Sequence, residues 1–235
     1  MVLTACRLDA AVDVVVEDDG RGTVEVVATL DPDALERIGG DLAAVLATDD
    51  LEAAGWQVSI PEPTEARLRH PFEDAAEANA VLADLSGERG PLRGLEVADD
   101  TSFARTEWTF DGTIDFSAGI AAFGDEALAE VLDGEAVGLS EAELEAELGH
   151  PVSEALGVAV SVRLPDDDGV QASWSADLGD PPVTMEAVGV KERSGTWIAV
   201  GVGAACALLL VILGLLRLRT RRGRRAAHLA DDGST

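Results

Sequence analysis

The sequence predicts an α+β domain, built as an antiparallel sheet with helices on one side and followed by one C-terminal transmembrane helix. Three observations support this prediction. Many segments alternate apolar and polar residues, as half-buried strands do. Other segments repeat apolar residues at helical spacing behind capping residues. Residues 197–216, WIAVGVGAACALLLVILGLL, carry no charge over a length that suffices for a helix to cross a bilayer.

A hairpin is predicted at the start of the chain. Apolar residues alternate along residues 8–16 and again along residues 24–30, and the turn DDGRG lies between them. The alternating residues are Leu8, Ala10, Val12, Val14 and Val16, followed by Val24, Val26, Ala28 and Leu30. Because successive side chains of a strand point to opposite faces, we expect these residues to face the core.

A helix is predicted to follow this hairpin directly. Asp31 suits the N-cap and Pro32 suits the first helical position. The apolar stripe of this helix consists of Leu35, Ile38, Leu42, Val45 and Leu46. Gly39 and Gly40 weaken the helix in its middle, since glycine has low helix propensity.

The next unit is predicted to contain two strands and a helix. The strands cover residues 56–60 and 66–70, and the helix covers residues 73–85. His70 continues the apolar phase of its strand, so we interpret it as a core histidine rather than a metal ligand.

The segment RTEWTFDGTIDF, residues 105–116, is predicted to form one long strand. Its apolar side chains, Trp108, Phe110, Ile114 and Phe116, all fall on one face. Asp-Gly often marks a two-residue hairpin turn. A hairpin here would place Trp108 opposite Asp115, which pairs an apolar side chain with a charge. The unbroken alternation of apolar and polar residues therefore favours a single strand that is bent or bulged at Gly112.

Two short helices and three strands are predicted in the remainder of the domain. The helices cover residues 124–132 and 140–148, and the strands cover residues 158–164, 170–174 and 183–187. Together with the earlier strands, these complete the predicted sheet.

The flanks of the segment 197–216 predict its direction in the membrane. Trp197 stands at one end, where an interfacial tryptophan is expected, and six arginines beginning with Arg217 and Arg219 follow the other end. Positive flanks stay in the cytoplasm. The sequence therefore predicts a single-pass protein of the cell membrane, with an extracytoplasmic domain (6–190), a juxtamembrane linker (191–196) and a basic cytoplasmic tail (217–235).

Residues 3–6, Leu-Thr-Ala-Cys, have the order of a bacterial lipobox, in which the cysteine carries lipid. Since the topology requires export, we interpret residues 1–5 as the remnant of a signal peptide and Cys6 as a lipidation site. A chance match is the alternative interpretation.

Composition and motifs argue against several classes of function. The formal net charge is -28, and six of the 17 basic residues belong to the tail, so the domain would repel phosphate backbones and nucleic-acid binding is not predicted. The sequence contains no GxSxG, HExxH, CxxC or phosphate-binding glycine loop. The acidic run 166–168 lacks the spaced ligands of a calcium loop and is interpreted as a solvated turn. Neither an enzyme nor a bound metal or cofactor is predicted.

The order of segments resembles the LppM family of actinobacterial envelope lipoproteins. The residues that carry the resemblance are LTACRLDAAVDVVVEDDGRGTVEVVATL, GTIDFSAGIAAFGDEALAEVLDG and VSVRLPDDDGVQASWSADL, and the resemblance covers most of residues 3–216. It implies an exported, lipid-anchored protein whose sheet-and-helix domain can enclose an apolar ligand, notably an envelope glycolipid. The loop before the tryptophan strand departs from the family, because it is shortened here to PDDDG, which puts any ligand contact by that loop in doubt.

Two interpretations of function remain open. In the first, the domain binds a membrane lipid or glycolipid in an apolar cavity lined by Trp108, Phe110, Ile114, Phe116 and Trp174. In the second, it is a scaffold or interaction module that regulates a membrane protein and has no ligand. A dry, elongated cavity would favour the first interpretation, and a filled core together with an exposed apolar patch would favour the second.

The membrane segment itself suggests a further contact. Gly201 with Ala205, and Gly203 with Ala207, place small residues one turn apart, which would permit a weak homodimer through the transmembrane helix.

Overall fold

The computed structural model describes residues 7–37, 39–46, 48–86, 90–117, 119, 145, 151, 153, 155–167 and 169–192. The predicted helix 124–132, the transmembrane segment 197–216, the basic tail and residues 1–6 lie outside these described residues, as does the predicted helix 140–148 apart from Glu145. Within the described part of the chain, no helix is long and apolar enough to span a membrane.

The described strands form two sheets rather than the single predicted sheet. The larger sheet has the order β3-β4-β2-β1-β7-β8, and the smaller has the order β5-β6-β9. The strands of the larger sheet are β1 (Leu8–Val16), β2 (Gly22–Leu30), β3 (Gln57–Glu62), β4 (Glu65–Phe72), β7 (Leu156–Leu164) and β8 (Val170–Asp177). The strands of the smaller sheet are β5 (Leu92–Thr101), β6 (Arg105–Ile114) and β9 (Val183–Glu192). The fold class α+β is confirmed, but its layers differ from the expectation.

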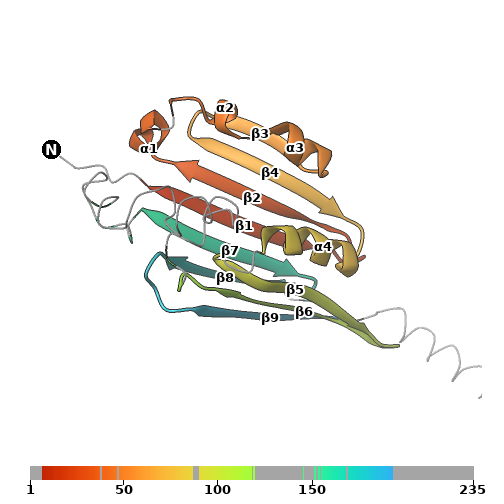
Figure 1. Ribbon diagram of the computed structural model, residues 1–235. Coiled ribbons are helices and arrows are strands. Elements are labelled where there is room, and N and C mark those ends of the chain that lie inside the picture. Colours follow the sequence, from red (N-terminus) through yellow and green to blue (C-terminus); the bar gives the residue numbers. More distant parts are fainter. Residues whose placement is uncertain are drawn as a thin grey trace, which may run out of the picture. The chain divides into compact units, whose positions relative to one another are not determined.

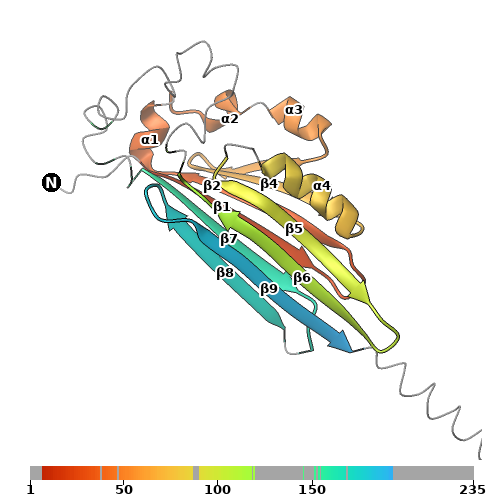
Figure 2. The same cartoon turned by 60° about the horizontal axis from the view of Figure 1, so that its bottom comes forward.

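The smaller sheet and helix α4 (Ala75–Leu85) cover one face of the larger sheet (Figures 1 and 2). Helix α4 contacts β5 and also lies against β2 and β4. Most described residues belong to one compact unit, Met1–Thr101 with Thr106–Lys191, and the second unit is Ser102–Arg105 with Glu192–Thr235. The core of the first unit is therefore enclosed between two sheets and one helix.

The first hairpin is confirmed, but the sheet is not antiparallel throughout. β1 pairs antiparallel with β2, from Leu8 opposite Leu30 to Val16 opposite Gly22. On its other side β1 pairs parallel with β7, with Leu8 opposite Leu156. The expectation of an antiparallel sheet was wrong at this pair, because the long connection from β6 to β7 returns the chain to the end of the sheet where β1 begins.

The predicted helix after the hairpin is broken at the two glycines. Helix α1 covers Pro32–Arg37 and helix α2 covers Leu42–Val45. Gly39 and Gly40 between them have φ values of 98° and 79°, which are left-handed conformations that end a helix. The N-cap is confirmed, since Asp31 Oδ1 accepts a hydrogen bond from the Ala34 N–H at 2.7 Å. A further helix, α3 (Thr48–Ala53), was not expected.

Helix α4 begins close to the predicted position because of its capping residues. The Asp74 side chain accepts a hydrogen bond from the Glu77 N–H at 2.9 Å. The Glu77 side chain in turn accepts one from the Glu73 N–H at 2.8 Å. This reciprocal arrangement satisfies backbone donors that the helix itself leaves unpaired.

The long strand predicted at residues 105–116 is confirmed as β6. Its partner β5 was not predicted. The pairing shifts register between Arg93, opposite Thr113, and Glu96, opposite Asp111. Two residues of β5 therefore face Gly112 alone, and one of them, Gly94, has a φ of 58°. The predicted irregularity at Gly112 is a bulge whose extra residue lies in β5.

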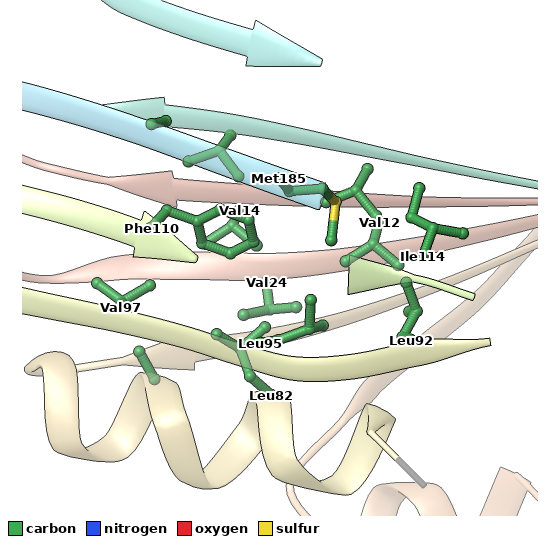
Figure 3. Packing of buried hydrophobic residues seen from close by; sticks show 14 of the residues in the cluster. Val12, Val14, Val24, Leu82, Leu92, Leu95, Val97, Phe110, Ile114 and Met185 are labelled. Atoms are coloured by element: carbon green, nitrogen blue, oxygen red, sulfur yellow. The ribbon is translucent and has the colours of Figure 1, made fainter. Parts of the chain in front are cut away.

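The core lies between the two sheets and consists of apolar side chains. Figure 3 shows Phe110, Met185 and Leu82, from β6, β9 and α4, gathered over Val12, Val14 and Val24 of the larger sheet. Within the part of the chain that the structure describes, no polar or charged residue is buried. His70 is half-buried and its ring meets that of Trp56 edge-on, with 5.4 Å between centroids. His70 therefore borders the core through Trp56 but is not itself one of the described core residues, so its interpretation as a core histidine holds only in part.

Candidate functional site

The structure brings the predicted aromatic face together inside the core. Phe110 and Ile114 on β6 are 0% exposed, and Trp108 on the same strand is buried. Phe116, two residues beyond the end of β6, is also buried. Trp174 lies across the interior on β8, half-buried and packed against the same cluster. All five residues proposed to line a cavity thus belong to one apolar cluster.

These side chains pack closely against each other and against their neighbours. The rings of Phe110 and Trp174 are stacked, with centroids 6.1 Å apart and planes 24° apart. At Gly112, an added Cβ would lie 2.7 Å from Leu95 Cδ2 and 3.0 Å from Met185 Cε. Even a methyl group at this position would therefore press on its neighbours, which is how a close-packed core behaves.

A hollow of about 360 Å³ lies on the opposite face of the larger sheet. It is formed across β2, β1, β7 and β8, because neighbouring strands bring small residues into line there. Ala11 pairs with Ala159, and Asp9 pairs with Gly157. The residues that line the hollow are Arg7, Asp9, Ala10, Ala11, Val27, Thr29, Gly157, Val158, Ala159, Ser175, Ala176 and Asp177. Sequence analysis did not find this hollow, since it depends on pairing between strands that are far apart in the chain.

Three charged side chains form ion pairs at one end of the hollow. The Arg7 guanidinium lies 2.9 Å from carboxylate oxygens of both Asp9 and Asp177. The hydrogen bond to Asp9 is the main cause that raises the pKa of Arg7, and Asp177 adds to it. Two carboxylates for one guanidinium leave this end net negative, which does not suit phosphate or another anion.

The acidic turn after β7 is engaged in contacts within the domain. The Asp166 carboxylate accepts a hydrogen bond from the Val190 N–H at 3.0 Å. Asp167 lies 3.5 Å from Lys191 Nζ, which also pairs with Asp18 at 3.4 Å. These contacts join the ends of β1, β7 and β9. Within the described ranges, no group of three or more potential metal ligands is found.

The predicted membrane-attachment residues cannot be placed. Cys6, Trp197, Arg217 and Arg219 lie outside the described residues. Their roles in lipidation and membrane anchoring stay predictions from sequence.

Comparisons with known proteins return one structural similarity of low score. The chain matches no protein-family model and no curated protein. It is similar to the NMR structure of the folded domain of LppM from Mycobacterium tuberculosis, with a TM-score of 0.38 and 12% sequence identity. The similarity covers 83% of this chain and 96% of that one. Family membership therefore stays a resemblance.

Proposed function

We propose that the chain is a membrane-anchored extracytoplasmic domain that acts through its outer surface, as a scaffold or interaction module for a membrane protein of the cell envelope. Export and anchoring follow from the uncharged segment 197–216 and the arginines after it. The observation that favours a surface role is the packing of the interior. Phe110 and Ile114 stand at the centre of the face that a lipid would need, and other side chains cover both completely.

This packing weighs against a lipid site of the predicted kind. A ligand cavity is usually present before the ligand arrives. Here an acyl chain would first have to separate Phe110 from Trp174, whose rings are stacked across the interior. The two sheets would also have to part, and the apolar contacts between them would be lost.

Lipid or glycolipid binding is the second candidate, favoured by the chemistry of the same interior. The described residues bury no polar or charged side chain, so an acyl chain between the sheets would meet only apolar groups. Each buried methylene would contribute about 0.8 kcal/mol. The aromatic face would then serve as the wall of a cavity that opens when lipid is present.

Lipid extraction and one substitution distinguish the two candidates. If the full chain works through its surface, mass spectrometry of organic extracts of the purified protein should show no lipid in stoichiometric amount. Phe110→Ala should then cost about 3–5 kcal/mol of unfolding free energy, as truncation of a core phenylalanine does. Phe103→Ala is the matched control, because Phe103 is 73% exposed and should lose little.

The opposite result would favour the lipid candidate. A stoichiometric lipid in the extract, together with a small loss of stability and weaker lipid retention in Phe110→Ala, would contradict the surface role. No catalytic function is proposed.

A further inference from the structure

We propose that the open edge of β8 is a homotypic pairing surface, at which two copies of this chain join their larger sheets through antiparallel β8 strands. This inference rests on the proposed surface role and names one partner for it. Among the described strands, β8 lies at one end of the larger sheet and pairs only with β7.

The pairing with β7 determines which backbone groups of β8 face outward. The Leu178 N–H donates to the Leu156 carbonyl oxygen at 3.0 Å, directly after the pair Asp177–Gly157. In an antiparallel ladder, hydrogen-bonded positions alternate. The even-numbered residues of β8 therefore bond to β7, and the odd-numbered residues Gln171, Ser173 and Ser175 direct N–H and C=O groups to the open side. The odd-numbered residue Asp177 follows the same alternation, because its N–H does not bond to β7 and instead donates to the Asp180 carboxylate at 2.9 Å.

The other described edge strands are protected against pairing. On β5, the Asn79 side chain accepts from the Val97 N–H at 2.7 Å and donates to the Val97 carbonyl at 2.9 Å. β3 contains Pro61, and its pairing with β4 shifts register between Ser59 and Glu62. On β9, the Val190 N–H is taken by Asp166. Proline, irregular pairing and side-chain caps are the devices that keep sheet edges from joining other chains.

β8 carries none of these devices between residues 170 and 176. Its sequence there, VQASWSA, contains no proline and no charge, although 26% of the chain is charged. The strand is also regularly paired along its whole length with β7. The seven uncharged residues of this edge, 170–176, form a template for another strand.

A second copy suits this edge because the uncharged sequence can pair with itself without opposing carboxylates. Antiparallel pairing about Ser173 would place Ser173 opposite itself, Gln171 opposite Ser175, and Ala172 opposite Trp174. No like charges would face each other on these strands, whereas contact elsewhere between two copies of a chain with net charge -28 would oppose carboxylates. The outward groups of Gln171, Ser173 and Ser175 would form about six backbone hydrogen bonds with those of the partner copy.

Cysteine cross-linking in membranes containing the full chain tests this register. In a chain with Cys6→Ser and Cys206→Ser, Ser173→Cys should form a disulfide-linked dimer, because facing Cα atoms in a bonded antiparallel pair are about 5.5 Å apart. Ser59→Cys is the matched control, an exposed serine on the opposite edge strand β3. Chains with Gln171→Cys should cross-link to chains with Ser175→Cys but not to one another, since like positions would be about 13 Å apart.

Substitutions that keep the fold give the second arm of the test. Ser173→Pro removes an N–H that faces the open edge. It removes none of the hydrogen bonds between β8 and β7, so the strand should persist while pairing with the second copy is blocked. The cross-link between positions 171 and 175 should fall at least tenfold in Ser173→Pro and stay unchanged in Ser173→Ala. If Ser173→Pro unfolds, Ser173→Asp serves instead, because it places two carboxylates opposite each other on an exposed site.

The proposal is overturned if Ser173→Cys cross-links no more than Ser59→Cys, or if its product contains a different protein. A dimer held only by the transmembrane helix would give that first result. Either outcome would leave the surface role itself to be decided by lipid extraction.

Discussion

At the scale of single residues, Asp115 connects the aromatic face to the neighbouring strand. Its carboxylate lies 2.9 Å from the Arg93 guanidinium of β5, and its backbone N–H donates to the Pro91 carbonyl at 2.7 Å. The Ser117 backbone N–H donates to Asp115 Oδ1 at 2.7 Å. These contacts hold the chain in place between Ile114 and Phe116, both of which are buried.

The contacts of Asp115 predict how stability depends on pH. The Ser117 N–H, then its hydroxyl and the charge of Arg93, lower the pKa of Asp115 in the folded chain. A carboxylate whose pKa is lower in the folded state stabilises the fold above its unfolded pKa of about 3.9, and this contribution is lost as the pH falls through the folded pKa. Asp115→Asn should therefore reduce the unfolding free energy at pH 7.

Chemical unfolding of both proteins from pH 7 to pH 2 measures this difference. The gap between the wild-type chain and Asp115→Asn should be widest at pH 7 and should narrow below pH 4. Asp111→Asn on the same strand is the control, because Asp111 is exposed. A gap that widens toward low pH would contradict the assignment.

At the scale of elements, the sequence was informative wherever a single strand or helix carries its own signal. The phase of Trp108, Phe110 and Ile114 indicated one long strand, and β6 has that form. Asp31 indicated a helix start, because caps act locally. Asp74, which caps α4, has the same local signal but was not singled out in the sequence. β5 was missed for a physical reason. Its bulge separates Leu92 from Leu95 by three positions, so the two-residue alternation that marks a strand is interrupted.

Pairing between distant strands left no comparable signal. β1 and β7 are separated by about 140 residues of chain and each alternates in the same way, so periodicity cannot tell a parallel from an antiparallel neighbour. The same limit applies to the candidate site. The aromatic residues were expected on one face, and they are, but alternation is identical for a packed core and for the wall of a cavity. The hollow beside Arg7 depends on Asp177, 170 residues away.

Two strand glycines allow a matched prediction about packing. At Gly22, an added Cβ would overlap the Val15 carbonyl oxygen and the ring of Phe72, where β2 runs between β1 and β4. At Gly112, its closest contacts would be with the ends of the Leu95 and Met185 side chains, and the nearest backbone atom, Leu95 Cα, would be at an ordinary contact distance of 3.6 Å. A backbone oxygen cannot move without disturbing the ladder, whereas flexible side-chain ends can shift.

Gly22→Ala should therefore cost about 3 kcal/mol or more of unfolding free energy, at the upper end for overpacking. Gly112→Ala should change it by about 1 kcal/mol or less, since alanine is also the better strand residue. Chaotrope unfolding of the two variants provides the comparison. Equal losses would mean that the strands at Gly22 can separate more easily than this arrangement implies.

At the scale of the whole molecule, the two ends of β1 correspond to the two proposed membrane attachments. Arg7, next to the proposed lipid site Cys6, lies beside Asp177 at the start of β1. Lys191, the first residue of the predicted linker to the transmembrane segment, pairs with Asp18 just past the end of β1. Nine strand residues at about 3.3 Å each separate these points by roughly 30 Å. If both attachments exist, the domain must lie along the bilayer rather than stand on it.

Fluorescence quenching by lipid headgroups tests this orientation in vesicles. With Cys206→Ser as background, one probe is attached at Pro182→Cys, in the turn after Asp177, and another at Asp19→Cys, beside the Lys191 end. Both probes should be quenched when Cys6 carries lipid. In Cys6→Ser, the probe at position 182 should lose its quenching because only the Lys191 end remains tethered, while the probe at position 19 should keep it. Unchanged quenching at position 182 in Cys6→Ser would show that the lipid does not hold that end of the domain to the membrane.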